Sequence, residues 1–369
     1  MLLLDVYFPT PYMETSLMVA QTTLNHRWCV GIDLHKDTLT ACTYCGCCGE
    51  ISWRKIACKN RQQIIDFFRG LPQPHTVAIE SVGFYRWLWE LAEPCVEKLV
   101  LADATGARAL AGRRLKTDRE DAANVAELLA ANKLPLAWAP TMEVQILRDL
   151  ARHRNVCSRQ HARILHRVRS LMNTNNRPGP KQLNSDSLIR YLRGQGEKLP
   201  ERHVAMLWSC VDQLTLTERQ IDQAERDLAP LLASETFRET RRILDSFPGV
   251  AMVAAATILG EVGDFTRFAD RKAIARYAGL NPRVFSSADK HRIGGIAKAG
   301  SRNLRWMLQQ AAWTAIRCDD RVKRIFHRIA KRSGRKAAAT AIARKLLVWM
   351  HRAVLRGQTY GAHETKSTT

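Results

Sequence analysis

The sequence predicts an α/β domain at its N-terminal end, a helical hairpin after it and a mainly helical domain at its C-terminal end. Three observations support this division. Short apolar runs of strand length recur before residue 102, apolar residues then follow heptad spacing on both sides of one break, and helical patterns dominate after about residue 237. The predicted boundaries are 1–26 for a variable extension, 27–140 for the α/β domain, 141–235 for the hairpin and 236–369 for the last domain.

The α/β domain is predicted to contain a mixed sheet. Strand patterns cover residues 28–35, 38–44, 51–58, 75–80 and 96–102. Helical patterns cover residues 61–71, the aromatic segment GFYRWLWELAEP, a stretch around 106–114 and a stretch from Asp118 to about Asn132. Because three strands precede the first helix and strands alternate with helices afterwards, the order is that of an RNase H-like fold, with helices packed on the faces of the sheet.

Two heptad runs make up the helical hairpin. Apolar residues keep three- and four-residue steps from Leu147 to Leu171 and again from Val204 to Leu232, with the turn NNRPGPKQLNSDS between them. This pattern predicts an antiparallel coiled coil that protrudes from the core. Its Arg-rich outer faces fit a nucleic-acid or subunit contact, and a purely structural hairpin explains the same pattern equally well.

Three segments characterise the last domain. DSFPGVAMVAAATILGEVGDF joins a Pro-Gly turn to a small-residue helix and resembles the helix-hairpin-helix element, whose turn offers backbone N–H groups to phosphates. A polar loop with paired serines then leads into a Gly-rich basic segment and a helix, within NPRVFSSADKHRIGGIAKAGSRNLRWM. Residues 321–356 have the pattern of a basic amphipathic helix, and neither common phosphate-loop motif occurs in the chain.

The charge points to a polyanionic partner. The chain has 57 Lys and Arg against 35 Asp and Glu, a formal charge of +22, and nucleic acid is the commonest partner of so basic a chain. Residues 151–180 contain seven Arg and no acid, whereas acids gather in the first third, as expected for an acidic site beside basic clamps. Without a signal-peptide pattern or a stretch of about 18 apolar residues, we expect no membrane association and a cytoplasmic protein.

The ten cysteines are expected to be free thiols. Four of them crowd one stretch, but no second CxxC and no His pair follows at zinc-ligand spacing: Cys42, Cys45, Cys47 and Cys48. The favoured interpretation is a hairpin of free thiols in a reducing cytoplasm, and a metal site is the alternative.

Four acids are candidates for a metal site. Asp118 and Asp121 are three residues apart on a predicted helix, so they share one face and repel each other unless a cation lies between them. Asp33 lies among apolar residues of the first strand, and Glu80 ends the fourth. In an RNase H-like sheet these strands are neighbours, so the four carboxylates converge, and two Mg²⁺ or Mn²⁺ ions need such oxygen ligands. A single strand Asp is more often a cap or an ion-pair residue. Nearby Asp37, Asp103 and Glu120 are interpreted as a turn residue, a strand-end residue and a solvent-facing helix position.

The paired serines, Ser286 and Ser287, are a second candidate site. Serine in a polar loop is usually only part of the loop, but here cations and glycines follow at once, and such a segment can bring backbone amides and cations to a phosphate. A hydroxyl group there could act as a nucleophile if a base or a metal ion activated it. The predicted nucleic-acid contacts are Lys290, Arg292, Lys298, Arg302 and Arg305.

Both candidate sites fall in segments that resemble one family, the DEDD-type transposases of the insertion-sequence-110 family, which are related to Piv-type DNA invertases. The segments span residues 28–317 and read VGIDLHKDT, VAIESVGFYRWLWE, RRLKTDREDAANVAELL, SFPGVAMVAAATILGEVGDFTRFADRKAIARYAGLNPR and SSADKHRIGGIAKAGSRNLRWMLQQAAW. The resemblance implies a RuvC-like N-terminal domain and a C-terminal transposase domain, joined by a coiled coil.

The resemblance also implies roles for single residues. Asp33, Glu80, Asp118 and Asp121 would be the metal-binding tetrad, and Ser287 the nucleophile that joins transiently to a DNA phosphate, with Ser286 as the reserve candidate. Family members read Ser-Gly at the nucleophile, whereas this chain reads Ser287-Ala288.

Partners follow from the same resemblance. Members act on donor and target DNA as homo-oligomers, as tetramers with composite sites, and are directed by a structured non-coding guide (bridge) RNA that pairs with both DNAs. Two alternatives stay open at this stage. One is a RuvC-like nuclease that resolves Holliday junctions with metal-activated water, and the other is a non-catalytic basic nucleic-acid scaffold.

Overall fold

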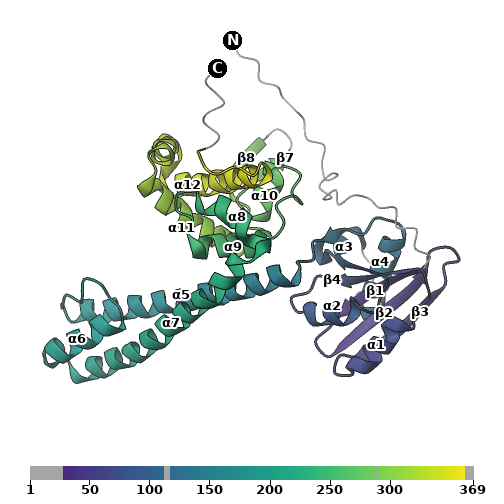
Figure 1. Cartoon of the computed structure of the whole chain (residues 1–369), viewed down its shortest axis with the longest axis horizontal. Helices are drawn as coiled ribbons and strands as arrows, with labels where there is room; N and C mark the ends of the chain where they lie inside the picture. Colours follow the sequence, from purple (N-terminus) through teal and green to yellow (C-terminus); the bar gives the residue numbers. More distant parts are fainter. Residues whose placement is uncertain (1–27, 112–116, 288–289, 362–369) are drawn as a thin grey trace, which may run out of the picture. The chain divides into compact units, whose positions relative to one another are not determined.

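The computed structural model describes residues 28–111, 117–287 and 290–361 (Figure 1). These residues fall into two compact units, which divide between Ala139 and Pro140. The first unit is a mixed α/β sheet domain and the second is mainly helical, as the sequence predicts. The finer division of the second unit at residues 235 and 236 stays a prediction.

The first unit is built on a six-stranded sheet with the order β3-β2-β1-β4-β5-β6. Its strands are β1 (Trp28–Leu34), β2 (Thr38–Cys45), β3 (Ile51–Ala57), β4 (His75–Glu80), β5 (Lys98–Ala102) and β6 (Leu136–Ala137). β1, β4 and β5 run parallel, and the other pairs are antiparallel. The five predicted strands are confirmed. The sixth was not predicted, because two residues are too short to show strand alternation.

Helices cover both faces of this sheet: α1 (Arg61–Arg69), α2 (Arg86–Ala92), α3 (Ala104–Ala111) and α4 (Asp118–Ala130). Val30 and Ile32 of β1 pack with residues of α1 and α2, whereas Cys29, on the alternate face, packs with residues of α4. Because side chains alternate along a strand, Gly31 and Asp33 also belong to the α4 face. The strand period therefore directs Asp33 toward the helix that carries Asp118 and Asp121.

Gly31 sets the distance between β1 and α4. A Cβ atom at this position would lie 2.2 Å from the carbonyl oxygen of Ala122 and 2.6 Å from the amide nitrogen of Ala126. The small residues Ala122 and Ala126 present the helix backbone to the strand at the same place, and both are fully buried. Helix α4 consequently lies closer to the sheet than any larger residue at position 31 would allow.

Two long helices open the second unit, α5 (Met142–Thr174) and α7 (Glu201–Ala233), which lie side by side in Figure 1. Their contacts fix the direction, because Arg154 bonds to Glu225 and His161 to Glu218. As the residue number rises on one helix it falls on the other, so the pair is antiparallel. Whether their packing is that of a coiled coil stays a prediction.

The connection between α5 and α7 differs from the predicted turn. The structure places helix α6 (Ser185–Gln195) and a short 3-10 turn, η1 (Gly196–Lys198), between them. Asn184 caps α6 in a capping box with Ser187, and Leu188 and Leu192 are buried in the same core as α5 and α7. The predicted turn segment thus contains the start of a helix, and its Asn-Ser-Asp-Ser run is a capping signal.

The remaining elements are α8 (Glu235–Asp245), α9 (Met252–Val262), α10 (Arg271–Tyr277), β7 (Pro282–Ser287), β8 (Lys290–Ile296), α11 (Arg302–Cys318) and α12 (Asp320–Leu355). Helix α12 has a break at Gly334, where φ is 78°, so the predicted basic helix is two helices that meet at a kink. The Pro-Gly turn joins α8 to α9, and Gly249 has a φ of 80° there. No helix in the described part of the chain is long and apolar enough to cross a membrane.

Candidate active site

The ends of two neighbouring parallel strands carry Asp33 and Glu80. Ile32 of β1 pairs with Ile79 of β4, so the two acids occupy the next register position on the same edge of the sheet. Both residues are nearly buried, with 5% and 6% of their surfaces exposed. Burying two carboxylates beside each other is costly unless cations face them.

Helix α4 adds the other two predicted acids. Thr117 precedes the helix, and its hydroxyl accepts a hydrogen bond from the backbone N–H of Glu120 at 3.2 Å, so the helix begins at Asp118. Asp118 and Asp121 then share the face that begins the helix. Burial is the largest cause of the raised pKa of Asp33, and the negative charges of Asp121 and Asp118 raise it further. The four predicted acids therefore lie in one unit, at the meeting point of β1, β4 and α4.

His35 joins two of these acids. Its Nε2 atom lies 3.0 Å from Asp33 Oδ2 and 3.3 Å from Asp118 Oδ1. The contact with Asp33 lacks hydrogen-bond geometry, and Asp33 Oδ2 is a buried oxygen with no hydrogen-bond partner among the described residues. One ligand atom from each of these three residues lies within 4.8 Å of the others.

A lysine and an arginine lie against two of the four acids. Lys55 Nζ of β3 lies 2.9 Å from Asp118 Oδ2, and Arg108 Nη2 of α3 lies 3.5 Å from Glu80 Oε1. The hydrogen bond from Lys55 lowers the pKa of Asp118. The cluster of carboxylates thus attracts positively charged side chains of the protein itself.

The two strand acids have raised pKa values. Burial is the largest cause for Asp33, followed by opposing effects of His35, which lowers the pKa, and of the α4 acids, which raise it. Burial is again the largest cause for Glu80, where Arg108 lowers the pKa and the charges of Asp33 and Asp121 raise it. Neighbouring like charges and an unsatisfied buried oxygen are what a divalent cation would relieve. The donor set, carboxylate oxygens with one imidazole beside them, fits a divalent metal ion.

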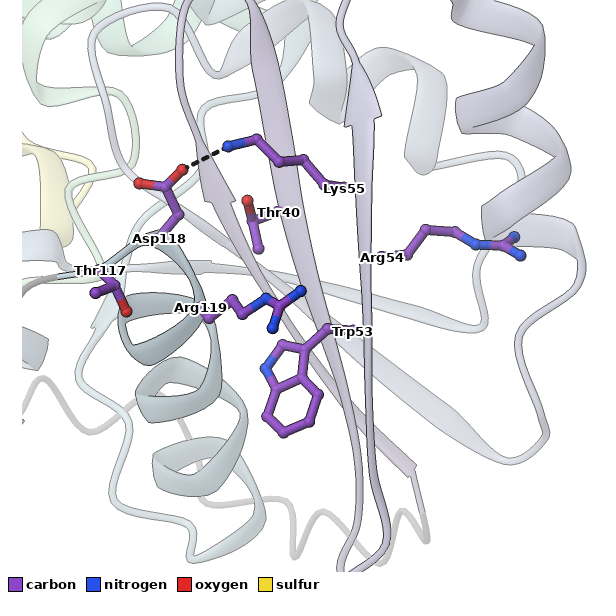
Figure 2. Close-up of a pocket in the computed structure, with 7 residues that line it drawn as sticks. All are labelled: Thr40, Trp53, Arg54, Lys55, Thr117, Asp118 and Arg119. Atoms are coloured by element: carbon purple, nitrogen blue, oxygen red, sulfur yellow. Dashed lines mark hydrogen bonds and ion pairs between the residues drawn. The ribbon is translucent and has the colours of Figure 1, made fainter.

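A pocket of about 520 Å³ opens beside Asp118 (Figure 2). Figure 2 shows Lys55 pointing to Asp118, with the Trp53 ring next to the Arg119 side chain. Trp53 is 46% exposed. The pocket thus joins a carboxylate, cations and an exposed aromatic ring. Its lining residues are Thr40, Trp53, Arg54, Lys55, Thr117, Asp118 and Arg119.

Three residues of the site are not predicted from the sequence: His35, Lys55 and Arg108. Only the first has a local sequence pattern that could have indicated it. His35 lies two residues after Asp33, and because that spacing leaves the side chains on one side of a strand, it could have been predicted. Lys55 and Arg108 carry no such signal, since their contacts depend on the position of β3 and on the packing of α3. The acids set aside earlier have the expected local surroundings: Asp103 accepts a hydrogen bond from the N–H of Thr105 at the start of α3, and Asp37 and Glu120 are exposed.

The second predicted site lies in the other unit, on the β7–β8 hairpin. Ser287 pairs with Lys290 and Ser286 with His291, so the serines end a strand, which corrects the prediction of a polar loop. The reason is local, because the preceding Val-Phe pair favours extended backbone. Ala288 lies outside the described residues.

The predicted basic contacts follow the same hairpin. Lys290 and Arg292 belong to β8 by their backbone positions. Lys298 is exposed with a φ of 59°, and Arg302 is exposed at the first position of α11. Arg305 already donates a hydrogen bond to the backbone oxygen of Ala278 at 3.1 Å, which ties part of its guanidinium to the fold.

Comparison with known proteins identifies the family. A family model described as "Transposase IS116/IS110/IS902 family" matches residues 241–327, and a second, named for the DEDD transposases of IS110 elements and described as a transposase, matches residues 30–176. The two matches together span more than half of the chain. The chain belongs to the IS110 family of transposases. Residues 30–176 contain all four acids of this transposase, and residues 241–327 contain both serines and the five basic residues.

Similar proteins carry names of the same kind. A Sinorhizobium fredii protein assigned as a transposase is 28% identical to this transposase over 295 residues, which cover 77% of this chain and 71% of the other. The transposase for insertion sequence element IS1328 of Yersinia enterocolitica is 24% identical, over 77% of this chain and 82% of the other. The pilin gene-inverting protein of Moraxella bovis is 26% identical, over 75% of this chain and 79% of the other.

Proposed function

We propose that this IS110-family transposase cuts and rejoins DNA with a metal-dependent acidic site and a serine nucleophile. The observation that supports this best is the convergence of carboxylates from β1, β4 and α4, with a buried oxygen of Asp33 that lacks a hydrogen-bond partner among the described residues. A basic chain has no structural need to place four acids together. Divalent metal ions explain why the acids are grouped there.

Asp33, Glu80, Asp118 and Asp121 would hold the ions, two Mg²⁺ or Mn²⁺ per site, with His35 beside them. Bound ions of this kind neutralise charge on a phosphodiester and polarise its phosphorus–oxygen bond. The protein's own contribution is positional. Short parallel strands and a closely packed helix hold the acids, and Lys55, whose hydrogen bond lowers the pKa of Asp118, would give way to a bound ion.

Ser287 is the proposed nucleophile, with Ser286 as the reserve candidate. Its Oγ attacks a DNA phosphorus, a phosphorus–oxygen bond to deoxyribose breaks, and the sugar hydroxyl leaves with the proton. The reverse reaction, with a new sugar hydroxyl as attacker, frees the serine and joins the strands. No high-energy cofactor is needed, because one phosphodiester bond replaces another. The cations Lys290, Arg292, Lys298 and Arg302 would hold the DNA or RNA backbone near the hairpin.

We extend the proposal to partners on the basis of charge and family. A formal charge of +22 suits two nucleic acids, donor or target DNA and a structured guide RNA from the same element. The antiparallel α5–α7 pair exposes several arginines of its Arg-rich run and offers a surface for RNA or for a second subunit of a homotetramer. The protein would act in the cytoplasm, at the nucleoid.

The experiment incubates the protein with Mg²⁺, guide RNA and both DNA partners, denatures the mixture and tests for protein–DNA adducts. We expect an adduct that Ser287→Ala abolishes and that Thr359→Ala, an exchange of a hydroxyl residue away from the hairpin, leaves intact. Loss with Ser286→Ala instead would move the nucleophile by one residue. Cleavage without an adduct, insensitive to both changes, would refute the serine mechanism and favour a junction-resolving nuclease. Binding without cleavage in any metal would favour a scaffold.

A further inference from the structure

The turn between β2 and β3 gathers three thiols. Cys45 is buried at the end of β2, and Cys47 and Cys48 are exposed in the turn that follows. The Sγ atoms of the three residues lie within 4.8 Å of one another, with Cys45 and Cys47 at 3.0 Å. Tetrahedral zinc, with bonds of about 2.3 Å to sulfur, holds its sulfur ligands roughly 3.8 Å apart. The three thiols are therefore close enough to reach one ion, once the sulfurs of Cys45 and Cys47 move apart by roughly 0.8 Å.

Two backbone hydrogen bonds close this turn. The N–H of Cys45 donates to the carbonyl of Glu50, and the N–H of Gly49 donates to the carbonyl of Cys45, both at 2.9 Å. Because these bonds join the residues on either side of Cys47 and Cys48, they keep both cysteines on the same short loop as Cys45.

Gly49 completes the motif. The sequence is Cys45-Gly46-Cys47-Cys48-Gly49, a CxxC pair followed by glycine, and Gly49 has a φ of 76°. Any other residue would be strained at this φ, and no atom lies within 4 Å of a Cβ atom placed there, so backbone conformation rather than space requires glycine. A tight turn with a left-handed residue directly after Cys48 lets the chain reverse within a few residues, which keeps the three cysteines together.

The turn is separate from the candidate active site. Cys45 pairs with Trp28 at one end of β1, whereas Asp33 pairs with Thr40 near the other end. Five residues of strand separate the two positions, which is about 17 Å at the usual rise per residue. An ion bound in this turn would therefore be too far from the acidic site for the two sites to share it.

We propose that Cys45, Cys47 and Cys48 form a site for one soft or borderline divalent ion, zinc in the cell, with a water molecule as the fourth ligand. Sulfur ligands select zinc over Mg²⁺, so the two sites of the first unit would take different metals. The ion would close the β2–β3 turn. Since β3 carries Trp53 and Lys55, this closure would hold one wall of the pocket beside Asp118 in place.

The test uses full-length protein, purified under reducing conditions and stripped of metal. Co²⁺ replaces zinc as the probe, because thiolate-to-cobalt charge-transfer absorption reports sulfur ligands and is blind to a carboxylate–histidine site. We expect about one cobalt ion per chain with tetrahedral absorption bands, displaced by Zn²⁺ and not by Mg²⁺. Bound Zn²⁺ should slow the alkylation of Cys47 and Cys48, read peptide by peptide by mass spectrometry.

The variants make the assignment specific. The double variant Cys47→Ser/Cys48→Ser changes only exposed residues and should lose the charge-transfer band and the protection from alkylation. Cys318→Ser, another exposed cysteine, should lose neither, and Asp33→Asn should also keep both. No charge-transfer absorption in the parent protein, or an unchanged band in the double variant, would overturn the proposal. So would a disulfide within the turn that persists in reducing buffer.

Discussion

The close contact between β1 and α4 gives the sharpest test of how the acidic site is held. In Gly31→Ala the new Cβ atom would lie 2.2 Å from the carbonyl oxygen of Ala122, whereas ordinary contact begins near 3.4 Å. The obstacle is the backbone of a helix, which cannot rotate away as a side chain can. Helix α4 would have to move outward by about 1 Å, taking Asp118 and Asp121 with it.

The expected loss follows from that displacement. A misplacement of about 1 Å in a catalytic constellation can cost about 100-fold in rate, and overpacking of this kind costs about 1–3 kcal/mol of stability. The assay is single-turnover DNA cleavage in Mg²⁺ with guide RNA present, with a thermal melt of each protein to establish that it is folded at the assay temperature.

Gly194→Ala is the matched control. Gly194 lies in helix α6, and no atom is within 4 Å of a Cβ atom placed there, so the same exchange should leave rate and stability unchanged or slightly raise stability. A folded Gly31→Ala protein that cleaves as fast as Gly194→Ala would refute the claim that close packing of α4 on β1 fixes the positions of the acids.

Three further outcomes are expected. Because burial raises the folded-state pKa of Asp33 and Glu80, the stability linked to these two acids is present at low pH and is lost as pH rises through their folded pKa values. In thermal melts in EDTA across pH, the double variant Asp33→Asn/Glu80→Gln should lose this pH dependence of stability and be more stable than the parent by about 1 kcal/mol at neutral pH. The same variant should no longer be stabilised by Mg²⁺. Glu261 should show the opposite pH dependence. Burial alone would raise its pKa, but the hydrogen bonds from Arg152 lower it, so its contribution to stability is present above the usual glutamate pKa and is lost on acidification. In thermal melts at acidic pH, Glu261→Gln should remove this dependence of stability on pH. Trp53→Ala should weaken binding of single-stranded DNA by about 1–3 kcal/mol in fluorescence anisotropy, with no change in the melt, because an exposed ring stacks on bases.

Much of the acidic site could be predicted from the chain. Asp33 and Glu80 are polar residues at the ends of apolar strands, and the topology of a mixed sheet makes those strands neighbours. Asp118 and Asp121 share a helix face by spacing alone, with Thr117 as a readable cap. These inferences depend on local periodicity, which a sequence displays directly.

The remainder depends on contacts between distant segments. Lys55 reaches Asp118 only because β3 pairs with β2 in one register, and no pattern near residue 55 indicates it. The start of helix α6 falls within the predicted turn, because the Pro and Gly residues before Asn184 are the stronger local signal. The strand position of Ser286 and Ser287 has a local cause, the preceding Val-Phe pair, but the polar composition of the segment concealed it.

Rates of DNA cleavage by four single variants would test the central claim most directly: Asp33→Asn, Glu80→Gln, Asp118→Asn and Asp121→Asn, each in saturating Mg²⁺. If the four acids form one metal site, each variant cleaves DNA at least about 100-fold more slowly than the parent. Changing a residue that only orients a metal ligand already lowers metal affinity or activity by about 10–100-fold. Glu120→Gln, an exposed acid in the same helical turn, keeps the parent rate. A folded variant among the four that cleaves as fast as Glu120→Gln would contradict the account.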